Sequence, residues 1–157
     1  MFFVDSMLGD LAKWLRILGY NTFYKPSISD EILLEMAYKN NGILITRDKL
    51  LYRKAVRRGV KTIYVEKNLC LENMLKKIIL KLGLRRKIDL NNTRCPKCNT
   101  PLIRVDKENI KNLIPIYVYK SYDIFLKCTG CGSIYWPGKH YKNMMKMLNQ
   151  MFQKRNK

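Results

Sequence analysis

A short segment in the first third of the chain, Ile43-Leu44-Ile45-Thr46-Arg47-Asp48, decides the fold. Its first four residues are aliphatic or β-branched and directly follow Gly42, which predicts a buried strand over 43–46. A short strand with no polar alternation is typical of a parallel sheet that is covered on both faces. The segment therefore predicts a central strand of an α/β fold.

Similar short strands are predicted on both sides of this segment, over 2–4, 22–24 and 62–65. Amphipathic stretches separate them. Leucines recur at helical spacing over 8–18, Ser29 is placed to cap a helix that ends at Gly42, and further helices are predicted over 51–56 and 72–82. Parallel neighbours need a crossover between them, so this alternation predicts an α/β domain over 1–88 with a mainly parallel sheet flanked by helices.

Four cysteines in two matched pairs characterise the second part of the chain: Cys95, Cys98, Cys128 and Cys131. Two residues within each pair let both thiolates converge on a tetrahedral ion, and two such pairs make a closed four-thiolate site. This spacing predicts a structural zinc ion, because four thiolates leave no open position for a catalytic water. Disulfides or a redox pair are the alternative interpretations.

Around the cysteines the pattern is weaker. Residues 84–94 are polar and basic and predict a linker, short β-type segments are predicted over 102–105 and 117–119, and a last helix over 140–152. Residues 89–157 are therefore expected to form a small zinc-ribbon module followed by a C-terminal helix.

Acidic residues stand where the predicted strands end. Asp5 follows the first strand, Asp30 begins the helix after the second, Asp48 follows the third, and Glu66 follows the fourth. The carboxyl ends of parallel strands share one edge, where ligands bind in open α/β sheets. Clustered carboxylates repel one another unless a cation lies between them, and Mg²⁺ or Mn²⁺ prefers such oxygens. Each acid taken alone also fits a capping or turn role.

Positive charge is spread over the whole chain. Lys and Arg number 31 against 12 Asp and Glu, a formal net charge of +19, and both predicted parts are basic. Such a surface attracts phosphate backbones, so nucleic acid is the expected partner. A membrane is disfavoured, because no run approaches the roughly 18 apolar residues of a span. No signal peptide precedes the first strand, so a cytoplasmic location is expected.

Several segments carry a family resemblance in combination. They are Phe3-Val4-Asp5-Ser6-Met7-Leu8-Gly9, Leu11-Ala12-Lys13-Trp14-Leu15-Arg16-Ile17-Leu18-Gly19-Tyr20, Ser29-Asp30-Glu31-Ile32-Leu33, Ile45-Thr46-Arg47-Asp48, and Cys128 to Cys131 with Gly132-Ser133-Ile134-Tyr135-Trp136-Pro137-Gly138-Lys139-His140. Together they resemble the mut-seven carboxy-terminal ribonuclease domain, a family similar to PIN-type nucleases fused to a zinc ribbon. The resemblance covers nearly the whole chain. It implies a PIN-like α/β fold and metal-dependent RNA cleavage, with Asp5, Asp30 and Asp48 at the acidic positions and the four cysteines in the ribbon.

The expected activity is metal-assisted hydrolysis of RNA, with structured RNA such as tRNA or rRNA as the expected partner. Glu66 is a candidate fourth catalytic acid. Arg16, Arg47 and His140 are candidate RNA-binding residues, although a solvated arginine and a structural histidine are the competing interpretations. Two other functions remain open: a non-catalytic RNA-binding zinc-ribbon protein, and a module that binds a protein partner through its Met-rich last helix.

Overall fold

The computed structural model describes residues 1–153 and contains a four-stranded parallel sheet in the order β2-β1-β3-β4. Its strands are β1 (Phe2–Val4), β2 (Thr22–Phe23), β3 (Ile43–Thr46) and β4 (Lys61–Tyr64). The crossovers contain a 3-10 turn η1 (Ser6–Leu8) with helix α1 (Gly9–Ile17), α2 (Asp30–Lys39) and α3 (Lys49–Arg57), and α4 (Leu71–Leu82) follows β4. The predicted α/β fold is confirmed. We call residues 1–82 the α/β unit.

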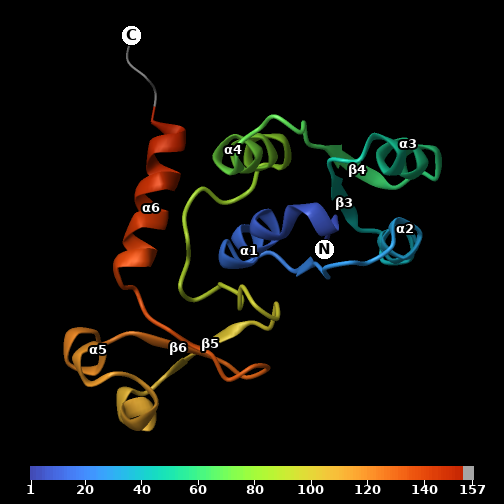
Figure 1. The fold of residues 1–157 in the computed structure, drawn as a ribbon. Helices are drawn as coiled ribbons and strands as arrows, with labels where there is room; N and C mark the ends of the chain where they lie inside the picture. Colours follow the sequence, from blue (N-terminus) through green and yellow to red (C-terminus); the bar gives the residue numbers. More distant parts are fainter. Residues whose placement is uncertain (154–157) are drawn as a thin grey trace.

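Helices cover both faces of this sheet, as the continuous apolar strands require (Figure 1). Because side chains alternate along a strand, Phe2 and Val4 lie on one face and Phe3 on the other. The first face packs against α1 and α4. The second packs against α2 and α3, through Leu33, Ala37, Leu51 and Ala55. Every strand of the sheet therefore contributes to the core or lies beside it, and the sheet is a rigid platform for its carboxyl edge.

The end of α2 differs from the sequence prediction. Ser29 caps its start as expected, since its hydroxyl accepts a hydrogen bond from the Ile32 amide. The helix, however, ends at Lys39, and the left-handed residue is Asn41 (φ 46°) rather than Gly42. Gly42 is needed for close packing instead, because a Cβ atom there would lie 2.4 Å from the Phe3 ring.

The segment over 84–94 is not a free linker, as its polar composition had suggested. Ile88 is buried in the core beside α1 and α4, and the buried Thr93 hydroxyl donates a hydrogen bond to the Ile17 carbonyl (2.7 Å). The Asn92 carbonyl oxygen would lie 2.1 Å from a Cβ atom at Gly19, so only glycine permits this approach. The segment is thus packed along the α/β unit.

The second sheet is antiparallel, with strands β5 (Leu102–Val105), β6 (Phe125–Cys128) and β7 (Ile134–Tyr135). Between β5 and β6 lie a 3-10 segment, η2 (Lys107–Leu113), and helix α5 (Ile116–Ser121). The predicted strand over 117–119 was wrong, because this stretch is helical and turns Val118 into a small core with Ile110 and Phe125. We call residues 95–138 the cysteine module.

The last helix, α6 (Lys139–Phe152), leaves the cysteine module and returns to α4 (Figure 1). Its Leu148 and Met151 are buried in the core shared with α1 and α4, and its other methionines are partly buried there. The Met-rich face of α6 therefore packs against α1 and α4 of the same chain. The division into domains 1–88 and 89–157 stays a prediction. No helix within residues 1–153 is both long and apolar enough to cross a membrane.

Candidate active site and cysteine cluster

Asp5 and Asp48 meet around one threonine at the carboxyl end of the sheet. The Thr46 hydroxyl, fully buried, donates a hydrogen bond to Asp5 Oδ2 (2.6 Å) and accepts one from the Asp48 amide (2.9 Å). The Asp5 amide donates to the Ile45 carbonyl, which fixes the start of its turn against β3. Two acids from different strand ends are thereby held in a fixed relation.

Each of these acids also caps the element that follows it. Asp5 caps η1 by accepting from the Met7 amide (3.4 Å), and it is only 3 % exposed. Asp48 caps α3 by accepting from the Leu51 amide (2.8 Å). Asp5 and Asp48 can therefore cap a helical turn and bind a cation at the same time, because a carboxylate that accepts one hydrogen bond still has free lone pairs.

Asp30, the first residue of α2, completes this group. Partial burial is the main cause that raises the pKa of its carboxyl, followed by the negative charges of Asp5 and then Asp48. The structure thus brings Asp5, Asp30 and Asp48 into one electrostatic field, and we call this group the carboxylate edge. Mutual repulsion of this kind is what a bound cation relieves.

The oxygens of the carboxylate edge are spaced more widely than the ligand atoms of the cysteine cluster. Within residues 1–153, the cysteines form the one group of three or more ligand residues whose atoms all lie within 4.8 Å of one another. The donor set still suits a hard cation such as Mg²⁺ or Mn²⁺, which keeps several waters and takes few carboxylates directly. Wider spacing favours contacts through such waters.

Glu66 lies near this edge but is paired with a cation. Lys77 Nζ is 2.7 Å from both carboxylate oxygens, and this hydrogen bond is the main cause that lowers the pKa of Glu66. Glu66 and Asp48 line the same hollow of about 540 Å³. The assignment of Glu66 as a fourth catalytic acid stays a prediction.

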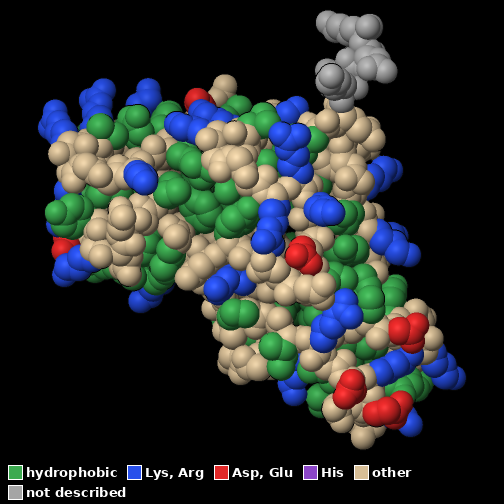
Figure 2. All heavy atoms as spheres, turned by 180° about the vertical axis from the view of Figure 1, so that it is seen from behind, with side chains coloured by type: hydrophobic (Ala, Val, Ile, Leu, Met, Phe, Trp, Pro, Cys, Tyr) green, Lys and Arg blue, Asp and Glu red, His purple; other side chains and the backbone are tan. Residues whose placement is uncertain are grey.

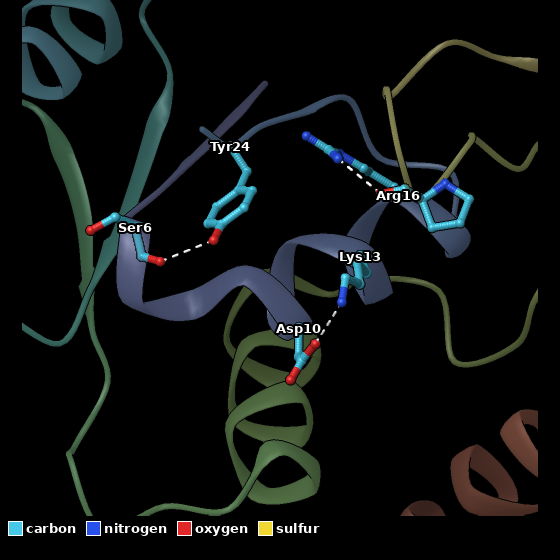
Figure 3. Close-up of polar contacts among 6 residues, drawn as sticks. Ser6, Asp10, Lys13, Arg16 and Tyr24 are labelled. Carbon is cyan, nitrogen blue, oxygen red and sulfur yellow. Dashed lines mark hydrogen bonds and ion pairs between the residues drawn. The ribbon is translucent and has the colours of Figure 1, made fainter. Parts of the chain in front are cut away.

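A second contact fixes the turn between Asp5 and α1 (Figure 3). The Tyr24 hydroxyl donates to the Ser6 carbonyl at 3.1 Å. A Cβ atom at Gly9 would lie 2.7 Å from that hydroxyl, so glycine leaves room for the tyrosine. Tyr24 thereby ties the segment after β2 to the residue that follows Asp5.

Arg16 is buried and hydrogen-bonded to the backbone, and the RNA contact expected of it stays a prediction. This side chain is 5 % exposed, and its guanidinium donates to the carbonyls of Thr22 (3.0 Å), Pro96 (2.9 Å) and Lys97 (3.2 Å). Figure 3 shows it leaving α1 away from the exposed Asp10–Lys13 pair. Burial lowers the pKa of Arg16, while the nearby Cys95 and Cys98 raise it. Arg16 therefore joins the α/β unit to the first pair of cysteines.

Arg47 and His140 occupy different surroundings. Arg47 Nη2 donates to the Leu69 carbonyl (3.5 Å) and lies 3.1 Å from Met74 Sδ, so the guanidinium points toward the start of α4. Its Nε is buried and has no partner within residues 1–153. His140 is exposed in the first turn of α6. RNA contacts by these two residues stay predictions.

The cysteines converge through two turns of the same geometry. In the first turn the Cys95 amide donates to the Thr100 carbonyl, and in the second the Cys128 amide donates to the Ser133 carbonyl. The fifth residue of each turn is left-handed: Asn99 (φ 71°) and Gly132 (φ 73°). The Sγ atoms of Cys95 and Cys131 are 3.6 Å apart, and those of Cys98 and Cys128 are 3.3 Å apart. This group could bind a zinc ion.

Hydroxyl groups surround the cluster. Tyr135 Oη lies 3.2 Å from Cys95 Sγ, Thr100 Oγ1 lies 3.4 Å from Cys98 Sγ, and Ser133 Oγ lies 3.4 Å from Cys131 Sγ. The contact with Thr100 is the main cause that lowers the pKa of Cys98 to about 6, whereas burial raises that of Cys128 to about 11. Metal-bound thiolates are commonly stabilised by such outer contacts.

The sequence prediction missed the contacts that three residues make. Thr46 looked like an ordinary strand residue, Tyr135 like a packing residue of the module, and Arg16 like a surface cation. A signal existed for Thr46 only, since it stands two residues before Asp48 at a predicted strand end. The bonds of Arg16 and Tyr135 cross between distant segments, so no local pattern reports them.

Positive side chains cover the surface around these sites. Figure 2 shows Lys and Arg spread over the back face, while several of the acids visible there gather at the end that carries η2 and α5. Asp106, Glu108 and Asp123 belong to that end. The remaining surface suits a polyanion.

The comparisons with known proteins agree with this arrangement. The family model described as Mut7-C RNAse domain matches residues 1–148. No curated protein and no solved structure matches the chain. The matched range contains the carboxylate edge and all four cysteines, and the chain therefore belongs to the Mut7-C RNAse domain family.

Proposed function

We propose that this protein is a metal-dependent ribonuclease that hydrolyses RNA phosphodiester bonds at the carboxylate edge. The observation that carries the proposal is the link between Asp5 and Asp48 through the Thr46 hydroxyl. The charges of these two acids also help to raise the pKa of Asp30, after burial, which supports a common site. Family membership supports the ribonuclease activity. RNA as the polyanionic substrate fits the net charge of +19.

Each residue of the carboxylate edge has its own role in this proposal. Asp5 and Asp48 are oriented by Thr46 and by the backbone amides that they cap, so their free lone pairs are fixed before any cation arrives. Asp30, the first residue of α2, would add a third negative charge to theirs. A bound Mg²⁺ or Mn²⁺ supplies positive charge for the phosphate and lowers the pKa of a water. Glu66 and Lys77 stand at the margin near Asp48.

The cysteine module would have a structural and RNA-binding role in this proposal. A zinc ion held by four thiolates has no free position for chemistry, so cleavage depends on the carboxylate edge alone. Structured RNA such as tRNA or rRNA is the proposed substrate, because basic residues cover both the α/β unit and the module.

The test is Asp48→Asn. Asparagine caps a helix about as well as aspartate, so α3 should remain intact while the cation loses a charged ligand. Losing several kcal/mol of charge stabilisation corresponds to at least about a 100-fold slower cleavage. Labelled RNA incubated with Mg²⁺ or Mn²⁺ measures the rate.

Asp123→Asn is the matched control, because Asp123 is 90 % exposed at its side chain and lies in the module. It should cleave at the wild-type rate. Equal cleavage by wild type and Asp48→Asn would contradict the proposal. RNA binding without cleavage by the wild type, across several RNAs and metals, would instead support the non-catalytic RNA-binding alternative.

A further inference from the structure

A groove of about 780 Å³ lies between the α/β unit and the cysteine module. One wall is the exposed face of α1, with Asp10, Lys13 and Trp14, and the opposite wall comes from α5, β7 and the start of α6. Part of the segment over 84–94 forms its floor through Ile88, Leu90 and Thr93. The groove is separate from the cysteine cluster and from the hollow beside Asp48.

Aromatic side chains are concentrated in this groove. Both tryptophans of the chain line it, and tyrosines join them from three elements: Trp14, Tyr117, Tyr122, Tyr135, Trp136 and Tyr141. Tyr117 is 69 % exposed, so most of its ring faces solvent. An exposed aromatic ring beside cations is a stacking platform that any unpaired base can use.

Helix α6, which begins at the groove, lacks the capping and acidic residues that usually stabilise a helix N-terminus. The α6 N-terminus has no side-chain cap and no acidic residue in its first turn, but carries Lys139 and His140 there. Cations at the positive end of a helix dipole are unfavourable, and uncapped amides need an acceptor. Such local conflicts are expected at functional sites. An anion bound at this end would satisfy the amides and offset the cations.

The net charge of the lining agrees with that interpretation. Lys13, Arg94, Lys139 and His140 line the groove, and its single acid, Asp10, is paired with Lys13 at 2.9 Å. Stacking rings and a phosphate-sized anion site in one groove match the two halves of a nucleotide. An acidic protein segment would match the cations but leave the rings without stacking partners.

Helix α1 leads from the groove toward the carboxylate edge. Helix α1 starts directly after η1, which Asp5 caps, and it ends beside the first cysteine turn, where Arg16 binds the Pro96 carbonyl. Its nine residues span about 13 Å. A chain lying along α1 therefore connects the two places.

We propose that this groove binds an unpaired segment of RNA, with bases stacked on its aromatic rings and a phosphate at the α6 N-terminus. The inference rests on the proposed RNA substrate and assigns a binding site to its single-stranded part. It distinguishes an unpaired strand from a duplex, whose bases already stack on one another and cannot reach the rings.

Tryptophan fluorescence gives a direct readout, because both tryptophans line the groove. The experiment uses full-length Asp48→Asn protein, so that RNA is not consumed, and titrates a short oligouridylate. We expect the emission to change on binding, and a blunt RNA duplex of equal length to bind more weakly. Binding of oligouridylate with no change in emission would overturn the proposal.

Tyr117→Ala locates the site without risk to the core, and Tyr38→Ala is its matched control, since Tyr38 is a 53 % exposed tyrosine on α2. Tyr117→Ala should weaken oligouridylate binding about tenfold, and Lys139→Gln should weaken it less. Tyr38→Ala should leave it unchanged. Equal binding by all three variants, or an equal fluorescence response to polyglutamate, would also overturn the proposal.

These outcomes are independent of cleavage. If the wild type cleaves no RNA but Tyr117→Ala loses binding and the emission changes, the groove is supported and the nuclease proposal fails. If the wild type cleaves and Tyr117→Ala binds normally, the nuclease proposal survives and the groove is refuted.

Discussion

The α/β unit and the cysteine module are stabilised by different means. Buried apolar residues from every helix of the α/β unit and from α6 fill both faces of its sheet. The module has a small core of Ile110, Val118 and Phe125, with Leu126 also buried and five partly buried apolar side chains packed against that core. A sheet this small with so little core needs a further constraint, and the four cysteines are the candidate. The comparison implies that one half depends on packing and the other on a metal.

The two cysteine turns differ in a related way. The first is bound to the α/β unit through Arg16 and through Asn99, whose Oδ1 accepts from the Thr22 amide (3.0 Å) and whose Nδ2 donates to Asn21 (2.7 Å). Within residues 1–153, the second turn, 128–133, forms its hydrogen bonds with residues of the module itself. The first turn therefore links the cysteine cluster to the packed core.

Removal of the metal should have the largest effect. Structural zinc contributes about 10–16 kcal/mol of apparent binding free energy in small domains, which is large beside what the small apolar core of the module can supply. We expect one zinc per chain by elemental analysis. After stripping with a strong chelator, amide hydrogen exchange should lose protection in β5–β7 and keep it in β1, β3 and β4.

Readdition of zinc should restore the protection. Protein that contains no thiophilic metal, or a metal-free module whose strands stay protected, would contradict the division between a packed half and a metal-held half.

Arg16→Lys should have a smaller effect, because it breaks the connection between the halves and neither half itself. Lysine keeps the charge but cannot donate to the three carbonyls in the fork geometry of arginine. Leaving buried carbonyls unpaired should lower the free energy of unfolding by about 1–3 kcal/mol. Denaturant unfolding measures it, and exchange should accelerate at the first cysteine turn more than at the second.

Arg58→Lys is the control, since Arg58 is an exposed residue that pairs with Glu35 and should change stability by about 0.5 kcal/mol or less. An Arg16→Lys protein as stable as this control would show that the halves are held together by other contacts.

The same comparison explains what the sequence could reveal. The strands and helices of the α/β unit follow from local patterns, because strands buried on both faces have apolar runs and helices have amphipathic spacing. The module lacks a periodic core, so its helix α5 was taken for a strand and β6 was not predicted. Its cysteines were still found, since metal spacing is a local signal.

The candidate site could be predicted only in outline. Strand ends place Asp5 and Asp48 at one edge, but the Thr46 hydroxyl that joins them depends on the register between β1 and β3. The other missed features concern residues whose contacts lie far away in the sequence. The segment over 84–94 is polar in composition, yet Ile88 and Thr93 are enough to anchor it, and Arg16 is buried by carbonyls that lie about eighty residues away.

Two neighbours in the first turn of α2 give the smallest and most local test. Asp30 and Glu31 share the same helix dipole, yet burial and the charges of Asp5 and Asp48 raise the pKa of Asp30, whereas its own backbone amide and Lys54 lower that of Glu31. A raised carboxyl pKa means that ionisation costs folded-state stability above the ordinary value of 3.8, and a lowered one means that ionisation contributes stability above 4.5. Asp30→Asn should therefore melt higher than Glu31→Gln at neutral pH.

The cost of ionising Asp30 should disappear as the pH falls through its raised folded-state pKa toward 3.8, whereas the contribution of Glu31 should be lost only below 4.5, as the pH falls through its lowered folded-state pKa. The difference in melting temperature should therefore shrink in acid. Added Mg²⁺ should raise the melting temperature of Glu31→Gln, which keeps the full carboxylate edge, more than that of Asp30→Asn. Thermal unfolding at several pH values, with and without Mg²⁺, measures both effects. If the two variants melted alike at neutral pH and responded alike to Mg²⁺, the carboxylate edge would carry no electrostatic repulsion for a cation to relieve. The α/β unit would then lose no stability to a cation site.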